Sequence, residues 1–209
     1  MKIAALKKKG NNVTVVFDDG TYRVLDYRVV VDYGIWKGQE IDDEKLELLS
    51  SESSLLKAKD SAFRFLGMRL HSKAELKLKL LKKKFPLDVI ENVLLYLQKE
   101  NYLNDEEFVI QFSAERVKRK KIGPAKLSAE LMKKGINREL IKTLLSSHDQ
   151  ENYFANALTL AEKKLVQIKR KETDPRRIAQ KLFTYLASKG YQSDVIRNVV
   201  ENLKLGNED

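Results

Sequence analysis

One apolar pattern occurs three times along this chain, and this repeat constrains the fold more than any other feature. In each copy, four apolar residues follow one another at intervals of four, five and five positions. The copies are Leu76, Leu80, Phe85 and Ile90, then Leu127, Leu131, Ile136 and Ile141, then Leu182, Leu186, Tyr191 and Ile196. Successive copies begin 51 and 55 residues apart. Such self-similarity is typical of tandem arrays of one supersecondary unit, which present a long binding surface rather than a catalytic pocket.

Helix-capping chemistry divides the repeated region into helices. Ser72 and Glu75 form a capping-box pattern at the start of one helix. Gly135 and Gly190 follow the equivalent helices of the second and third copies, where glycine commonly ends a helix. We therefore predict three helices per unit and an elongated, curved all-α array. The predicted units are approximately 55–103, 104–148 and 149–205.

The first 40 residues favour β-structure instead. Val13 to Phe17 and Tyr22 to Leu25 are rich in β-branched and aromatic residues, and Asp19-Gly20 between them is a strong hairpin signal. The valine-rich segment from Tyr27 to Tyr33 is predicted to be either another strand or a strand that enters a helix. The fold class expected is therefore mainly α, with a small β-rich head at the N-terminus.

A short acidic helix is predicted for residues 42–49, followed by a serine-rich linker over residues 50–54. We place the domain boundary there, which gives a head of residues 1–52 and an all-α domain of residues 53–209. The single tryptophan, Trp36, is expected to pack the head onto the linker.

The composition excludes several classes of protein. The chain has no cysteine, so disulfides and thiolate metal sites are excluded. No apolar run approaches the roughly 18 residues that a membrane-spanning helix needs, and the first residues do not resemble a signal peptide. We therefore expect a cytoplasmic protein that is not bound to a membrane, and we expect it to be a monomer.

Charge is distributed unevenly along the chain. Residues 1–50 hold 8 basic and 9 acidic side chains, a net charge of −1, whereas residues 51–209 hold 32 and 21, a net charge of +11. A basic helical body favours a polyanionic partner, above all nucleic acid. The alternative is a lysine-rich surface whose only role is solubility.

The sequence contains no recognisable catalytic constellation. The two histidines, His71 and His148, are far apart and fall near predicted helix ends, where a capping or surface role is expected. Phosphate-binding loops, dinucleotide-binding glycine patterns and metalloprotease motifs are absent. Acidic clusters at residues 42–44 and 105–107 suit helix N-termini and need no metal. We expect no enzyme activity, no metal and no cofactor.

The basic residues supply the candidate binding site. Arg116, Arg119 and Lys120 are spaced to share one helix face, and Lys118 and Lys121 adjoin them. Further candidates crowd the ends of other predicted helices. These are Arg69, Lys73, Lys83 and Lys134. The nearby Phe108 and Phe112 are expected to belong to the core rather than to stack on bases.

Together these residues resemble one family, the RecX regulatory proteins. The first unit resembles the family at Ala62, Leu66, Arg69, Ser72, Glu75, Leu76 and Leu80. The most specific segment comprises Tyr102 to Asp105, Phe108, Phe112, Arg116, Gly123, Leu127, Glu130, Leu131 and Lys134 to Ile136. Residues 33–38 are similar to the head of longer members. The chain departs from the family pattern at Asn101 and Lys84, where glycine is common, and its third unit matches only by pattern.

The resemblance implies a non-enzymatic modulator of the RecA recombinase, active in DNA repair, recombination and the SOS response. RecX proteins lodge in the groove of the RecA filament on single-stranded DNA and depress ATP hydrolysis, strand exchange and co-protease activity. An autonomous DNA-binding helical protein without a RecA partner is the main alternative, because helix-turn-helix units also produce basic hairpins. A structural interaction protein with a merely basic surface is the third.

Overall fold

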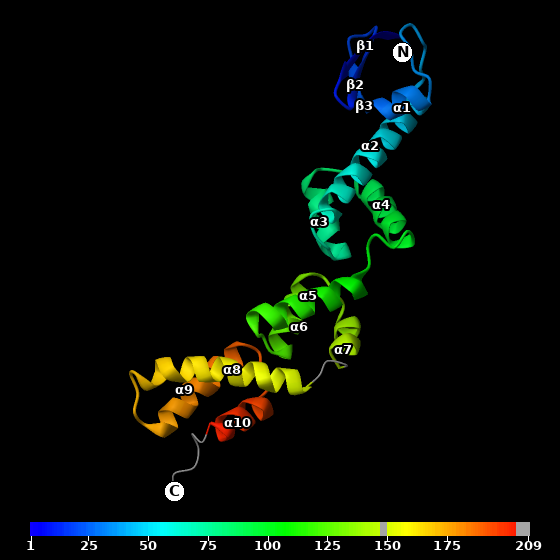
Figure 1. Cartoon of the computed structure of the whole chain (residues 1–209). Helices are drawn as coiled ribbons and strands as arrows, with labels where there is room; N and C mark the ends of the chain where they lie inside the picture. Colours follow the sequence, from blue (N-terminus) through cyan, green and yellow to red (C-terminus); the bar gives the residue numbers. More distant parts are fainter. Residues whose placement is uncertain (147–149, 204–209) are drawn as a thin grey trace. The chain divides into compact units, whose positions relative to one another are not determined.

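The computed structural model describes residues 1–146 and 150–203 of the chain. Over those ranges it contains three strands followed by ten helices, arranged as two compact units, Met1–Asn104 and Asp105–Asp209 (Figure 1). The predicted fold class, mainly helical with a small β-rich head, is confirmed.

The head is a three-stranded antiparallel sheet with the order β1-β2-β3. Its strands are β1 (Ile3–Lys9), β2 (Asn12–Phe17) and β3 (Tyr22–Asp26), so the predicted hairpin is confirmed, with Gly20 in its turn at a φ of 82°. The segment from Tyr27 to Tyr33, predicted as a strand or as a strand that enters a helix, forms helix α1 (Tyr27–Asp32) instead. Asp26 caps this helix, because its carboxylate accepts a hydrogen bond from the Arg28 amide at 3.0 Å.

The predicted serine linker is wrong, because helix α2 (Asp43–Leu66) runs unbroken through it. Ser53 is buried in this helix, and its hydroxyl oxygen accepts a hydrogen bond from the Asp26 amide of β3 at 2.7 Å. Serine therefore serves here as a polar contact to the sheet edge rather than as a helix breaker. Along α2, Leu49 is the last buried residue of the head core and Ala58 the first of the first repeat's core, whereas the partly buried Leu56 and Leu55 pack against the head and the repeat respectively. The predicted boundary at residue 52 thus falls inside one helix.

Trp36 does not pack as predicted. It is 61% exposed, in the loop between Gly34 and Gly38.

The first repeat consists of the second half of α2 together with α3 (Lys73–Lys82) and α4 (Leu87–Lys99). The predicted cap is present, because the Ser72 hydroxyl accepts a hydrogen bond from the Glu75 amide at 3.1 Å. The second repeat contains α5 (Asp105–Lys120), α6 (Pro124–Lys133) and α7 (Arg138–Ser146). The third contains α8 (Gln150–Lys169), α9 (Pro175–Ser188) and α10 (Ser193–Asn202).

The twelve repeated apolar positions form the interiors of the three units. Eleven of them are buried, and Phe85 is partly buried. The turn between the second and third position of each copy has the same backbone. Its last residue has a positive φ, which is 63° at Lys84, 78° at Gly135 and 89° at Gly190. The next residue then donates its amide to the carbonyl five residues back, at 3.2–3.4 Å. Lys84 thus adopts a glycine conformation.

The second and third repeats are joined through two glycines. The Gly123 amide donates to the Lys189 carbonyl at 2.8 Å, and the Ala125 amide donates to the Gly190 carbonyl at 3.1 Å. A Cβ atom on Gly123 would overlap the backbone of Gly190 and Tyr191. The start of α6 therefore rests on the turn between α9 and α10, backbone against backbone.

Candidate binding surface

The last turn of α5 presents a cluster of cations to solvent. Lys118, Arg119 and Lys120 are all exposed, and we call these three residues the α5 basic turn. Arg119 is 77% exposed and forms an ion pair with Glu115, one turn back on the same helix, at 3.2 Å. Exposed pairs of this kind contribute only about 0.3–0.5 kcal/mol, so a stronger anionic partner displaces them readily.

Arg116 lies one turn before Arg119 and Lys120 on the unbroken helix α5, but its side chain is engaged by a neighbouring helix. Its Nε is 2.8 Å from Glu130 Oε2 on α6, and its guanidinium lies 4.7 Å from the centroid of the Phe112 ring. Arg116 therefore links α5 to α6 within the second repeat. Phe112 stacks on Phe108 with a centroid separation of 5.5 Å, and Phe108 is buried, as predicted for a core residue.

Lys121 joins the second repeat to the third. Its φ is 49°, and its ammonium donates a hydrogen bond to the Asn156 side chain at 2.7 Å. Its carbonyl accepts a hydrogen bond from the Tyr191 hydroxyl at 2.6 Å. Burial raises the pKa of Tyr191, which keeps that hydroxyl protonated as the donor.

The remaining predicted site residues lie at helix ends. Arg69 forms a two-pronged pair with Glu75, at 3.0 and 3.1 Å, just before α3. Lys73 is the first residue of α3, whereas Lys83 and Lys134 follow the last turns of α3 and α6. Cations at helix C-termini complement the helix dipole, so these last two have a structural role available to them.

The histidine prediction needs correction for His71. Its side chain is only 2% exposed, and Nδ1 lies 2.9 Å from the Arg69 carbonyl oxygen. Burial lowers the pKa of His71 below its ordinary value of 6.5, so the ring is neutral at pH 7. His148 lies outside the described residues.

The described ranges contain no group of three histidine or carboxylate side chains that could hold a metal ion. Over the same ranges, every helix is too short or too polar to cross a bilayer.

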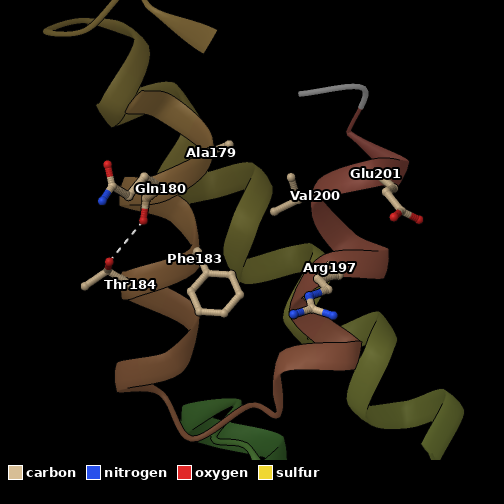
Figure 2. A pocket seen from close by; sticks show the side chains of 7 residues that line it. All are labelled: Ala179, Gln180, Phe183, Thr184, Arg197, Val200 and Glu201. Carbon is tan, nitrogen blue, oxygen red and sulfur yellow. Dashed lines mark hydrogen bonds between the residues drawn. The ribbon is translucent and has the colours of Figure 1, made fainter. Parts of the chain in front are cut away.

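The third repeat has a groove that the sequence did not reveal. It lies between α9 and α10, with a volume of about 550 Å³, and Phe183 and Val200 form part of its apolar lining (Figure 2). Arg197 and Glu201 supply its charged rim. In the first repeat, the positions equivalent to Phe183 and Arg197 by the repeat spacing are Lys77 and Glu91, which form an ion pair at 3.3 Å. The repeated apolar pattern gave no signal for this groove, because only the residues between its positions differ.

Comparison with known proteins matches this architecture repeat by repeat. Three family models match: "RecX, first three-helix domain" over residues 58–97, "RecX, second three-helix domain" over 104–145 and "RecX, third three-helix domain" over 151–200. The "Regulatory protein RecX" of Clostridium perfringens (strain SM101 / Type A) is 32% identical over 96% of this chain and 94% of its own length. That of Clostridioides difficile (strain 630) is 30% identical over 97% and 94%.

Solved structures support the same fold. The "Crystal structure of regulatory protein RecX" superimposes with a TM-score of 0.74 and 21% identity, covering 96% of this chain and 98% of that one. RecX from Lactobacillus salivarius gives a TM-score of 0.67 and 22% identity, covering 73% of this chain and 97% of that one. With all three helical domains matched and relatives aligned over almost its whole length, this chain belongs to the RecX family of regulatory proteins.

Proposed function

We propose that this chain binds the RecA filament on single-stranded DNA and inhibits the ATP hydrolysis, strand exchange and co-protease activity of RecA. In the cell it would thereby restrain recombinational repair and the SOS response. The observation that carries the proposal is the match of all three helical repeats to the RecX domains, in order and in one chain. A chain of tandem repeats suits a filament, because both are built from successive copies of one unit.

We assign the electrostatic contact with the filament to the α5 basic turn, Lys118, Arg119 and Lys120. These side chains are exposed, and Arg119 has only a weak local partner. Lys73, Lys83 and Lys134 are secondary candidates. Arg116, Lys121 and Arg69 are already engaged by Glu130, Asn156 and Glu75. We therefore give these three residues a supporting role in the proposal.

The deciding experiment is RecA ATPase on single-stranded DNA, titrated with the full-length protein. Full-length variants are preferable to truncation, because α2 carries core residues of both the head and the first repeat. Replacing the α5 basic turn by three glutamines should raise the half-inhibitory concentration roughly tenfold, since three exposed ionic contacts together contribute about 1–2 kcal/mol.

The matched control is a second triplet of lysines. Lys7, Lys8 and Lys9 on β1 are also exposed, and their replacement by glutamine removes the same charge from the head. This control should inhibit as the wild type does. Absence of any inhibition by the wild-type protein, together with tight duplex binding without RecA, would refute the proposal and support an autonomous DNA-binding protein instead.

A further inference from the structure

A row of exposed aromatic side chains runs along the seam between α2 and α4 in the first repeat. Phe63, Tyr96 and Tyr102 are 38%, 36% and 54% exposed. The rings of Phe63 and Tyr102 meet edge to face, with centroids 5.1 Å apart. One turn earlier on α2, the ammonium of Lys59 lies 4.0 Å from the centroid of the Tyr96 ring. We call these four residues the α2–α4 seam.

The turn that follows α4 fixes the backbone position of Tyr102. Asn101 takes a positive φ of 56°, and the Tyr102 amide then donates to the Leu97 carbonyl at 2.8 Å. The next residue, Leu103, is buried in the core of the repeat. The Tyr102 backbone is thus held between a hydrogen-bonded turn and a buried anchor, so little backbone conformational entropy is lost when its ring is covered.

Cations adjoin the rings. Lys59 is part of the seam, and two exposed cations stand near the rings in sequence, Arg64 one residue after Phe63 on α2 and Lys99 three residues after Tyr96 on α4. The carboxylate nearest to Lys59 in sequence, Asp60, is engaged by Arg28 of the head at 2.6 Å. Exposed aromatic rings with lysine and arginine close by are the chemistry of single-stranded nucleic-acid binding, in which bases stack on aromatic side chains while lysine and arginine meet the phosphates.

We propose that the α2–α4 seam binds single-stranded DNA, with bases stacking on Tyr96 and Tyr102 and phosphates meeting Lys59, Arg64 and Lys99. A protein partner is less well matched, because the ammonium of Lys59 lies over the Tyr96 ring and the exposed Arg64 and Lys99 stand close by in sequence, so the surface is not purely apolar. The inference deepens the proposed function and rests on it for the physiological ligand, the single-stranded DNA of the RecA filament. The binding itself requires no RecA.

The test is fluorescence anisotropy of a labelled oligothymidylate with the full-length protein and no RecA. The double variant Tyr96→Leu and Tyr102→Leu keeps apolar bulk but removes both rings, and it should raise the Kd by on the order of a hundredfold at about tenfold per ring. Tyr96→Phe with Tyr102→Phe keeps the rings and should bind as the wild type does. Tyr22→Leu, which removes an exposed tyrosine from the head, should also leave the Kd unchanged.

The salt dependence separates the two kinds of contact. Lys59→Gln should flatten the slope of log Kd against log salt by about 0.7, the value for one phosphate of a single strand, whereas the leucine variant should leave the slope unchanged. Thermal melting of each variant checks that the repeat remains folded.

Failure of the inference and failure of the proposed function give different results. Unchanged oligothymidylate binding by the leucine variant overturns the seam assignment, even if RecA inhibition is intact. Loss of RecA inhibition without loss of DNA binding would identify the seam as a protein-docking surface, and that too overturns it. A wild-type protein that binds DNA through the seam but leaves RecA untouched would instead refute the proposed function alone.

Discussion

Replacing Gly123 by alanine should destabilise the protein, although such a change usually does the opposite. The φ of Gly123 is −80°, a value that any residue adopts without strain. At such a position Gly→Ala normally adds about 0.4–1 kcal/mol of stability by restricting the unfolded chain. Here the added Cβ would overlap the backbone of Gly190 and Tyr191, so the second and third repeats must separate.

The size of the effect follows from the contacts that separation breaks. These are the Gly123 and Ala125 amide hydrogen bonds to the α9–α10 turn, at 2.8 and 3.1 Å, and the Tyr191 hydroxyl bond at 2.6 Å. Three bonds at about 1 kcal/mol each, less the gain from the unfolded chain, give a net loss of about 2 kcal/mol.

Hydrogen exchange measures this loss locally, which matters because repeat arrays need not unfold in one step. Exchange of the amide at Ala125 should become about thirtyfold faster in Gly123→Ala, since 1.4 kcal/mol is a factor of ten. Gly67→Ala is the matched control, because Gly67 has an ordinary φ of −66° at the end of α2 and does not adjoin another repeat's backbone. Equal or greater protection at Ala125 in the Gly123 variant would refute the close approach of the two glycines.

Three further predictions concern single side chains. Lys84→Gly should raise the free energy of unfolding by about 1 kcal/mol in urea titrations, because the φ of 63° is strained for lysine; a loss of stability would contradict the assignment. Arg116→Gln should lower the free energy of unfolding by about 1 kcal/mol, whereas Lys118→Gln should change it by less than about 0.5 kcal/mol. Equal effects would refute the view that Arg116 links α5 to α6 while Lys118 is only a surface cation. The Arg28 side chain holds the pKa of Asp26 below its ordinary value of 3.8. The ionised Asp26 carboxylate therefore contributes its full stabilisation above pH 3.8, and this contribution is lost as the pH falls through the lower pKa that Asp26 has in the folded state. Asp26→Asn should accordingly reduce the loss of stability at acid pH, measured as the urea midpoint against pH.

The repeat core could be predicted closely from the sequence. Apolar spacing located the positions that became buried, and the local chemistry of Ser72, Gly135 and Gly190 located helix ends. Such signals are contained within a few residues, where a cap or a turn forms from its own neighbours. The prediction failed where distant residues decide the outcome. The serines of α2 resemble a linker until Asp26 of the sheet supplies a partner for Ser53.

The candidate site was less predictable for the same reason. Helical spacing places Arg116 on one face with Arg119, but it gives no sign that the Arg116 side chain pairs with Glu130 on α6. The α2–α4 seam was missed because its rings come from two separated segments, α2 and the end of α4 with the turn after it. The pairing of Lys59 with Tyr96 requires knowledge of how α2 and α4 pack.

The unbroken α2 also limits how the chain can lengthen or shorten. One inserted residue within a helix turns everything beyond it by about 100° and advances it by about 1.5 Å. Because α2 holds the head at one end and the first repeat at the other, one residue inserted between Leu49 and Ala58 would rotate the α2–α4 seam about the helix axis relative to the sheet. Seven residues, close to two full turns, come near to restoring the original facing. Length variation in this helix should therefore occur in steps of about seven residues. The length of α2 thus sets the rotation of the first repeat relative to the head.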